Sequence, residues 1–138
     1  ILVEAIKLAA DEVHAVNRRA REESTDPRRL LAGYIRAYTD VALERSSLIA
    51  VWSSEARHVS HERRSPMSKR LRSWTKEWVD ALCDARPDLS PDEARLLVTG
   101  AIGLITSFAT GPECHDEALD LGSTITAMAL ATLETPIE

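Results

Sequence analysis

The sequence contains few cysteine, glycine and aromatic residues, and it has no hydrophobic run long enough to cross a membrane. Its two cysteines, Cys83 and Cys114, have neither zinc-ligand nor CxxC spacing, which argues against a disulfide framework and favours a reducing, cytoplasmic location. The apolar run after Arg95 is shorter than the roughly 20 residues that a bilayer requires, and it is interrupted by Gly, Thr and Ser. We therefore expect no membrane partner.

The composition is that of one globular domain over residues 1–138. Hydrophobic residues make up 44% of the chain and charged residues 28%, which allows a core and excludes general disorder. The net charge of -5 argues against this chain binding nucleic acid or anionic lipid by itself. The sequence starts at Ile1 within a helical pattern that has no N-cap, so we expect it to be part of a longer product.

Helical periodicity runs through the whole sequence, and no stretch alternates long enough to predict a strand. The pattern predicts an all-α domain of six helices with short loops, which favours antiparallel neighbours. Helix starts are indicated by Asp-Pro, Ser-Pro and Ser-Pro-x-Glu sequences. The first predicted helix covers residues 1–23 and the sixth covers residues 117–134. The second is predicted to begin at Pro27 after the cap Asp26, the third after Ser46 or Ser47, the fourth at Pro66 after the cap Ser65, and the fifth at Pro91 after the cap Ser90.

The fifth predicted helix has no charged side chain between Arg95 and Glu113. One side of this helix is bulky, and the other carries smaller residues. The bulky side consists of Ala94, Leu97, Val98, Ala101, Ile105 and Phe108. The sixth helix has a similar mixture of small and bulky residues. We therefore predict that both helices pack on a second copy in a four-helix, two-fold interface. The alternative is that the fifth helix is the central helix of a monomer. The predicted interface residues are Leu96, Gly100, Gly103, Ser107, Gly122, Ile125, Thr126 and Ala129.

The few aromatic residues are concentrated on neighbouring helices rather than scattered. They suit either an apolar pocket with a few polar groups or a plain core, and the residues alone leave both open. They are Tyr34, Tyr38, Trp52, Trp74, Trp78 and Phe108.

Polar candidates close to these aromatics in the sequence are Glu55 and His58, which have the Glu-x-x-His spacing of di-iron helical bundles. A second such pair is missing from the sequence, so we expect no metal site and no cofactor. The sequence has no nucleophile elbow and no glycine-rich phosphate loop, and we do not expect an enzyme. The alternatives still open are a helical interaction module without a small-molecule ligand, and a helical metal-binding protein or enzyme.

Three segments resemble the C-terminal domain of tetracycline-repressor (TetR) family transcription regulators. They are "SSEARHV", the W-x-x-x-W helix and "PDLSPDEARLLVTGAIGLI", and the resemblance is clearest from Tyr34 to Phe108. The resemblance implies that the last two helices form a homodimer and that the middle helices enclose a small, often apolar effector. It also implies a helix-turn-helix headpiece of about 50 residues, absent from this chain, that precedes Ile1 and binds operator DNA.

The expected function is therefore that of a ligand-responsive regulator, with repression as the expected mode. The first helix is expected to pass the effect of ligand binding to the headpiece. By the resemblance, the aromatic residues and Ile105 shape the cavity, and Glu55 or His58 bonds a polar group of the ligand. The implied ligand-binding residues are Tyr34, Tyr38, Trp52, Glu55, His58, Trp74, Trp78, Ile105 and Phe108.

Overall fold

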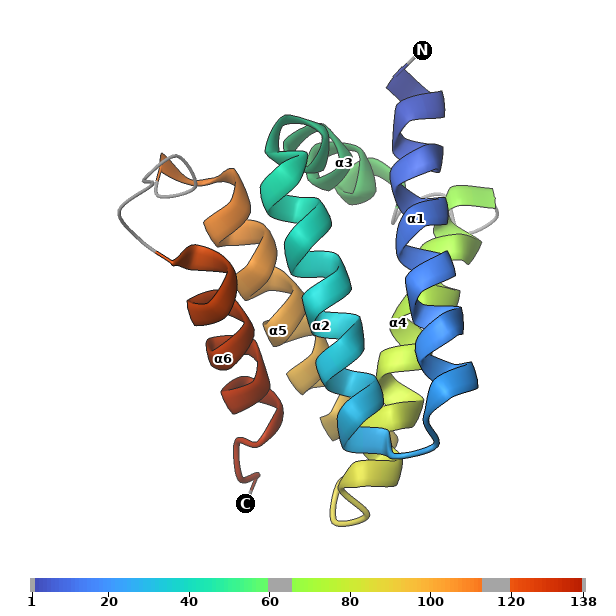
Figure 1. Ribbon diagram of the computed structural model, residues 1–138, viewed down its shortest axis with the longest axis vertical. Helices are drawn as coiled ribbons and strands as arrows, with labels where there is room; N and C mark the ends of the chain where they lie inside the picture. The colour runs from blue at the N-terminus through green and yellow to red at the C-terminus, as the bar shows by residue number, and fades with distance from the viewer. Residues whose placement is uncertain (1, 60–65, 113–119, 138) are drawn as a thin grey trace.

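The computed structural model describes residues 2–59, 66–112 and 120–137, without the side chains of residues 2, 3, 55–59 and 66–68. Over these ranges the chain forms six helices and no strand, so the all-α prediction is confirmed (Figure 1). The helices are α1 (Leu2–Glu23), α2 (Pro27–Glu44), α3 (Ser46–Val59), α4 (Pro66–Ala85), α5 (Pro91–Thr110) and α6 (Leu121–Leu133).

Side chains that accept hydrogen bonds from the first turn determine where three helices begin. Asp26 accepts from the Arg28 amide before α2, and Ser90 forms a capping box with Glu93 before α5, as their sequences predict. Before α6 the cap is Asp120, whose carboxylate accepts from the Ser123 amide. The prediction of an unbroken helix across residue 120 is therefore wrong, because Asp120 stands at the N-cap and outside the helix, while the predicted start at residue 117 lies outside the described residues. The predicted cap before α4, Ser65, lies outside the described residues.

The central helix is α2, which contacts each of the other five helices (Figure 1). Its buried positions cover a broad side of the helix and include Tyr34, Ile35, Tyr38 and Ala42, while Arg36 and Asp40 are exposed. The interpretation of the fifth helix as the central one is thus wrong. Helix α5 buries only its bulky side, and its other side faces solvent.

The predicted interface residues separate into three groups in the single chain. On α5, Leu96, Gly100, Gly103 and Ser107 are exposed, so the predicted division of α5 into two sides is confirmed. On α6, Gly122 and Thr126 are half-buried. Ile125 and Ala129 are only 1% and 0% exposed. They are thus corrected to core residues of the chain itself, because α6 turns them toward α2 and α5, the helices it packs against.

Arg86, in the turn after α4, joins that turn to the end of α6. Its guanidinium donates hydrogen bonds to the carbonyl oxygens of Leu133 (3.0 Å) and Thr135 (2.7 Å) and to a carboxylate oxygen of Asp88 (2.9 Å). The last carbonyls of a helix have no partner within the helix, and a cation near them is favourable. Buried Arg86 therefore fixes the C-terminal end of α6 against the end of α4.

Replacing this arginine is expected to destabilise the fold. Arg86→Met keeps much of the side-chain length but leaves two carbonyl oxygens without their donor, so the free energy of unfolding should fall by about 2 kcal/mol. Urea denaturation monitored by circular dichroism measures the change. The control is Arg95→Met on the exposed side of α5, which should change stability by less than about 0.5 kcal/mol. Equal losses in the two variants would contradict the role given to Arg86.

Candidate ligand-binding site

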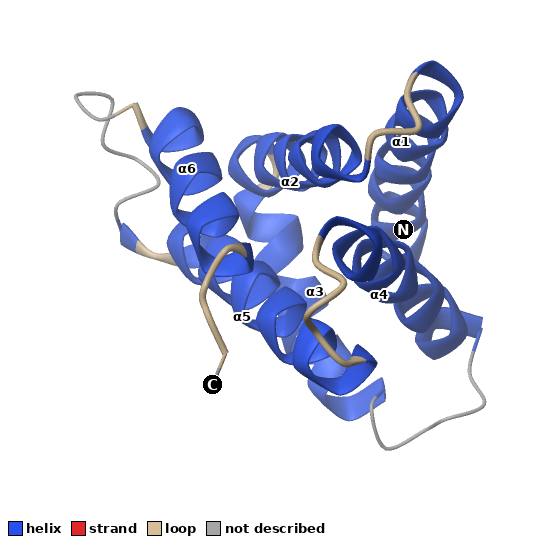
Figure 2. Ribbon diagram, turned by 90° about the horizontal axis from the view of Figure 1, so that it is seen from below, coloured by secondary structure: helices blue, strands red, loops and turns tan. Residues whose placement is uncertain are grey.

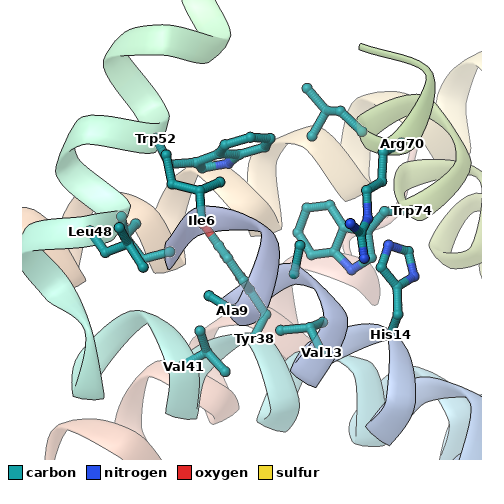
Figure 3. Close-up of a pocket in the computed structure, with 13 residues that line it drawn as sticks. Ile6, Ala9, Val13, His14, Tyr38, Val41, Leu48, Trp52, Arg70 and Trp74 are labelled. Carbon is teal, nitrogen blue, oxygen red and sulfur yellow. The ribbon is translucent and has the colours of Figure 1, made fainter. Parts of the chain in front are cut away.

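A pocket with a cavity volume of about 70 Å³ opens between α1, α2, α3 and α4, and it is partly open to solvent (Figure 3). The lining residues are Ile6, Ala9, Ala10, Val13 and His14 of α1, Tyr38 and Val41 of α2, Leu48, Ile49 and Trp52 of α3, and Arg70, Leu71 and Trp74 of α4.

Helix α1 forms one wall because its apolar residues recur every three or four positions and so lie on one face. Ile6, Ala9 and Val13 of this face are buried. The small side chains of Ala9 and Ala10 leave space that larger residues would fill. Opposite them, Trp52 and Leu48 of α3 and Trp74 of α4 form the other walls (Figure 3).

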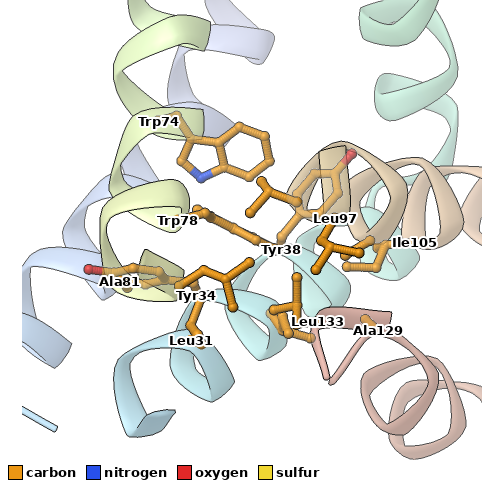
Figure 4. Close-up of a cluster of buried hydrophobic side chains, with 14 of the residues drawn as sticks. Leu31, Tyr34, Tyr38, Trp74, Trp78, Ala81, Leu97, Ile105, Ala129 and Leu133 are labelled. Atoms are coloured by element: carbon orange, nitrogen blue, oxygen red, sulfur yellow. The ribbon is translucent and has the colours of Figure 1, made fainter. Parts of the chain in front are cut away.

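The aromatic residues of α2 and α4 form one continuous cluster. The ring centroids of Tyr38 and Trp74 are 5.0 Å apart with planes at 62°, and those of Trp74 and Trp78 are 5.4 Å apart at 69°. Tyr34 stacks on Trp78 at 6.3 Å (Figure 4). Edge-to-face arrangements of this kind are favourable. The cluster lines the pocket at one end and belongs to the solid core at the other.

Three of the residues predicted to bind the ligand, Tyr38, Trp52 and Trp74, line the pocket. Tyr34 and Trp78 do not. Tyr34 lies one turn before Tyr38 on α2 and Trp78 one turn after Trp74 on α4, and there they are only 1% and 0% exposed. The side chains of Glu55 and His58 lie outside the described residues.

Helix α5 contributes no residue to the lining of this pocket, contrary to the prediction for Ile105 and Phe108. Ile105 is fully buried in the main core, and Phe108 is half-buried against it. The reason is that α5 packs directly on α2, α3 and α4. Its bulky side fills the space between these helices, and the pocket lies on the other side, toward α1.

The α1 wall and Arg70 were not predicted as site residues from the sequence. The apolar stripe of α1 is what a helix packed on a core also shows, so periodicity alone does not distinguish the two. The available signals were the small residues Ala9 and Ala10 and the polar residue His14, which lies next to that stripe.

The hydroxyl group of Tyr38 is used within the protein. It lies 2.6 Å from the Thr106 hydroxyl, which donates its own hydrogen to the Ile102 carbonyl oxygen at 2.8 Å. Tyr38 is therefore the donor to Thr106, since a threonine hydroxyl has one hydrogen. Burial raises the pKa of Tyr38. Tyr38 thus offers the pocket its ring and not an ionisable group.

Two polar side chains, His14 and Arg70, belong to the lining, and they lie beside each other (Figure 3). Arg70 forms an ion pair with Asp11, one turn before His14 on α1. Burial lowers the pKa of His14, and the neighbouring charge of Arg70 lowers it further, against the opposing effects of Glu77 and Asp11. His14 is therefore neutral near pH 7 and has one N–H donor.

Two buried polar groups near the pocket have no hydrogen-bond partner within the described chain. Both amide atoms of Asn17, which is fully buried, are without one, and so is the indole nitrogen of Trp74. Asn17 lies on α1 one turn beyond Val13, on the face that forms the wall. Buried polar atoms usually have a partner. Trp74 is a lining residue and Asn17 is not, so it is the indole N–H of Trp74 that can still bind a polar group or water in the pocket.

The described ranges hold no group of three or more His, Cys, Asp or Glu side chains placed to bind a metal ion. In the same ranges, none of the helices combines the length and the apolar character needed to cross a membrane. No protein-family model matches the sequence, and no curated protein matches it.

The lowered pKa of His14 predicts a pH dependence of stability. An unfolded histidine has a pKa near 6.5, and folding lowers it. As the pH falls through this value the unfolded chain binds a proton more readily than the folded one, so the free energy of unfolding decreases. His14→Gln should reduce this decrease between about pH 7 and pH 5.

Urea titrations of both proteins across this interval measure the effect. The other three of the four histidines are present in both proteins, so the difference in slope isolates His14. An unchanged slope in the variant would show that folding does not change the pKa of His14, and a steeper slope would show that folding raises it; either result would contradict the prediction.

Proposed function

We propose that this chain is the effector-binding and dimerisation domain of a ligand-responsive transcriptional regulator, a repressor similar to those of the tetracycline-repressor family. The observation that carries the proposal is the apolar pocket walled by α1. It lies among the middle helices, where the sequence resemblance predicts an effector site, and Tyr38, Trp52 and Trp74 line it.

The position of α1 suits it to respond to a ligand. It packs mainly on α2 and forms one wall of the pocket. It meets α4 through the Asp11–Arg70 and Arg21–Glu77 ion pairs. Exposed ion pairs contribute little to stability, so α1 can adjust its position relative to α4 at a small cost. If a ligand fills the pocket better when α1 is in one position than in another, binding increases the population of that position of α1.

The exposed sides of α5 and α6 support a dimer. The two helices lie side by side at the edge of the bundle opposite α1 (Figure 2). Leu96 and Met128 are 68% and 39% exposed, and they are two of the three large exposed hydrophobic residues in the described chain. Both lie on this side, which is uncharged from Leu96 to the end of α5 and throughout α6.

Gly103 adds an independent argument for a partner on this face. A Cβ atom at this position would meet nothing within 4 Å, and the backbone needs no positive φ there. Glycine costs about 1 kcal/mol relative to alanine inside a helix. Neither space nor conformation in the single chain explains this cost, whereas close approach by a second α5 helix does.

Gly103→Glu is expected to convert a dimer to a monomer without disturbing the fold. The added side chain has open space in the single chain, but it places two like charges together across a two-fold axis. Sedimentation equilibrium should give twice the chain mass for the unmodified protein and the chain mass for the variant. Ser73→Glu, which adds the same charge on an exposed position of α4, should remain a dimer. A monomeric unmodified protein would contradict the proposed interface.

The regulator function is tested on the intact gene product. We expect a headpiece of about 50 residues before Ile1, and selection from random DNA should return two half-sites separated by about one helical turn or a multiple of it. Gly103→Glu should weaken binding to the selected DNA strongly, and Ser73→Glu should not. Absence of the headpiece, or of specific DNA binding, would overturn the proposal and favour an interaction module.

A further inference from the structure

The ionisable side chains among the described lining residues lie on one side of the pocket. Apart from the engaged hydroxyl of Tyr38 they are His14 and Arg70, and within the described part of the chain no lining residue is acidic. Figure 3 shows both on the same side of the cavity, away from Leu48 and Trp52. The pocket thus has an apolar interior and one cationic edge.

Arg70 can bind a second anion while it keeps its place. A guanidinium has five N–H donors, and its fork matches a carboxylate. The bond to Asp11 is made through one terminal nitrogen, Nη2. Asp11 is largely exposed, so water can replace Arg70 as its partner. The side chain of Arg70 is itself about two-thirds buried against the pocket wall, which strengthens its interaction with a ligand placed there.

The potential around His14 also favours an anion. The charged groups that act on it are Asp11 and Arg21 of α1 and Arg70 and Glu77 of α4. Of these four, Arg70 has the largest effect, and Glu77 is already paired with Arg21. A neutral His14 can donate one hydrogen bond to a carboxylate oxygen beside Arg70.

We propose that the pocket binds an amphipathic organic acid, with its apolar body between Ala9, Trp52 and Trp74 and its carboxylate at the edge formed by Arg70 and His14. This inference rests on the proposed function and specifies the chemical class of its effector. An apolar cation is disfavoured, since it would meet Arg70, and none of the described lining residues is acidic. A small inorganic anion would leave the apolar walls unfilled.

The test compares two probes that share one apolar body, decanoate and decan-1-ol, by quenching of tryptophan fluorescence near neutral pH. Trp52 and Trp74 line the cavity and report its occupation. We expect the unmodified protein to bind decanoate at least about tenfold more tightly than the alcohol, the size of a charge-assisted interaction.

Variants test whether the difference in affinity between decanoate and decan-1-ol comes from the edge formed by Arg70 and His14. Arg70→Gln should weaken decanoate binding by about tenfold and leave decan-1-ol within about twofold. Asp11→Asn should strengthen decanoate binding a few-fold, roughly the effect of removing a competing exposed ion pair. Lys69→Gln is the matched control, because it removes the same charge from the exposed neighbour of Arg70 and should change neither probe. Circular dichroism verifies that each variant is folded.

Each outcome separates this inference from the proposed function. Equal binding of both probes, unaffected by Arg70→Gln, would overturn the organic-acid proposal and leave a ligand pocket in place. Binding that persists in Ala10→Phe, which fills the pocket from the α1 wall, would place the probes elsewhere and overturn it as well. If neither probe binds, the organic-acid proposal fails. If specific DNA binding by the intact product is also missing, the regulator proposal fails with it.

Discussion

The burial of α2 by the five other helices is the constraint on which the rest of this structure depends. Ile35, Thr39 and Ala42 are fully buried, and along this stretch only the side that carries Arg36 and Asp40 is exposed. The rings of Tyr34 and Tyr38 extend from α2 and meet Trp78 and Trp74 of α4, and the Tyr38 hydroxyl reaches Thr106 of α5. On the α1 side, the small residues Ala9 and Ala10 line the pocket together with Tyr38 and Trp74.

The fold could be predicted from the sequence because its determinants are local. Asp26-Pro27 and the Ser90–Glu93 capping box specify helix starts within a few residues of chain. The two sides of α5 follow from which of its residues are bulky and which are small, and the structure buries the first and exposes the second. Ile125 and Ala129 were placed wrongly because α6 has small residues all around, so composition does not show which side turns inward.

The pocket could be predicted only in part, because a cavity depends on what faces a residue across space. Trp74 and Trp78 occupy the same face of α4 one turn apart, and periodicity gives them the same role. The first lines the pocket and the second is fully buried, since the chain leaves space beside one and none beside the other. The α1 wall was missed for the same reason: a stripe facing a cavity and a stripe facing a core have the same sequence pattern.

The pocket and the uncharged face of α5 and α6 lie on opposite sides of α2, which bears on how a signal could pass between them. A dimer formed through α5 and α6 would hold those helices fixed relative to the partner. Helix α1 lies at the far edge of the bundle (Figure 2). Exposed ion pairs connect it to α4, and a pocket that a ligand can fill lies between the two helices. A shift of α1 would therefore leave the dimer intact and move whatever precedes Leu2. In a two-fold dimer of this kind both copies would shift α1 equally, and both shifts would contribute to the change in distance between the two attached segments. A ligand needs only a modest difference in affinity between two positions of α1 to bias that distance.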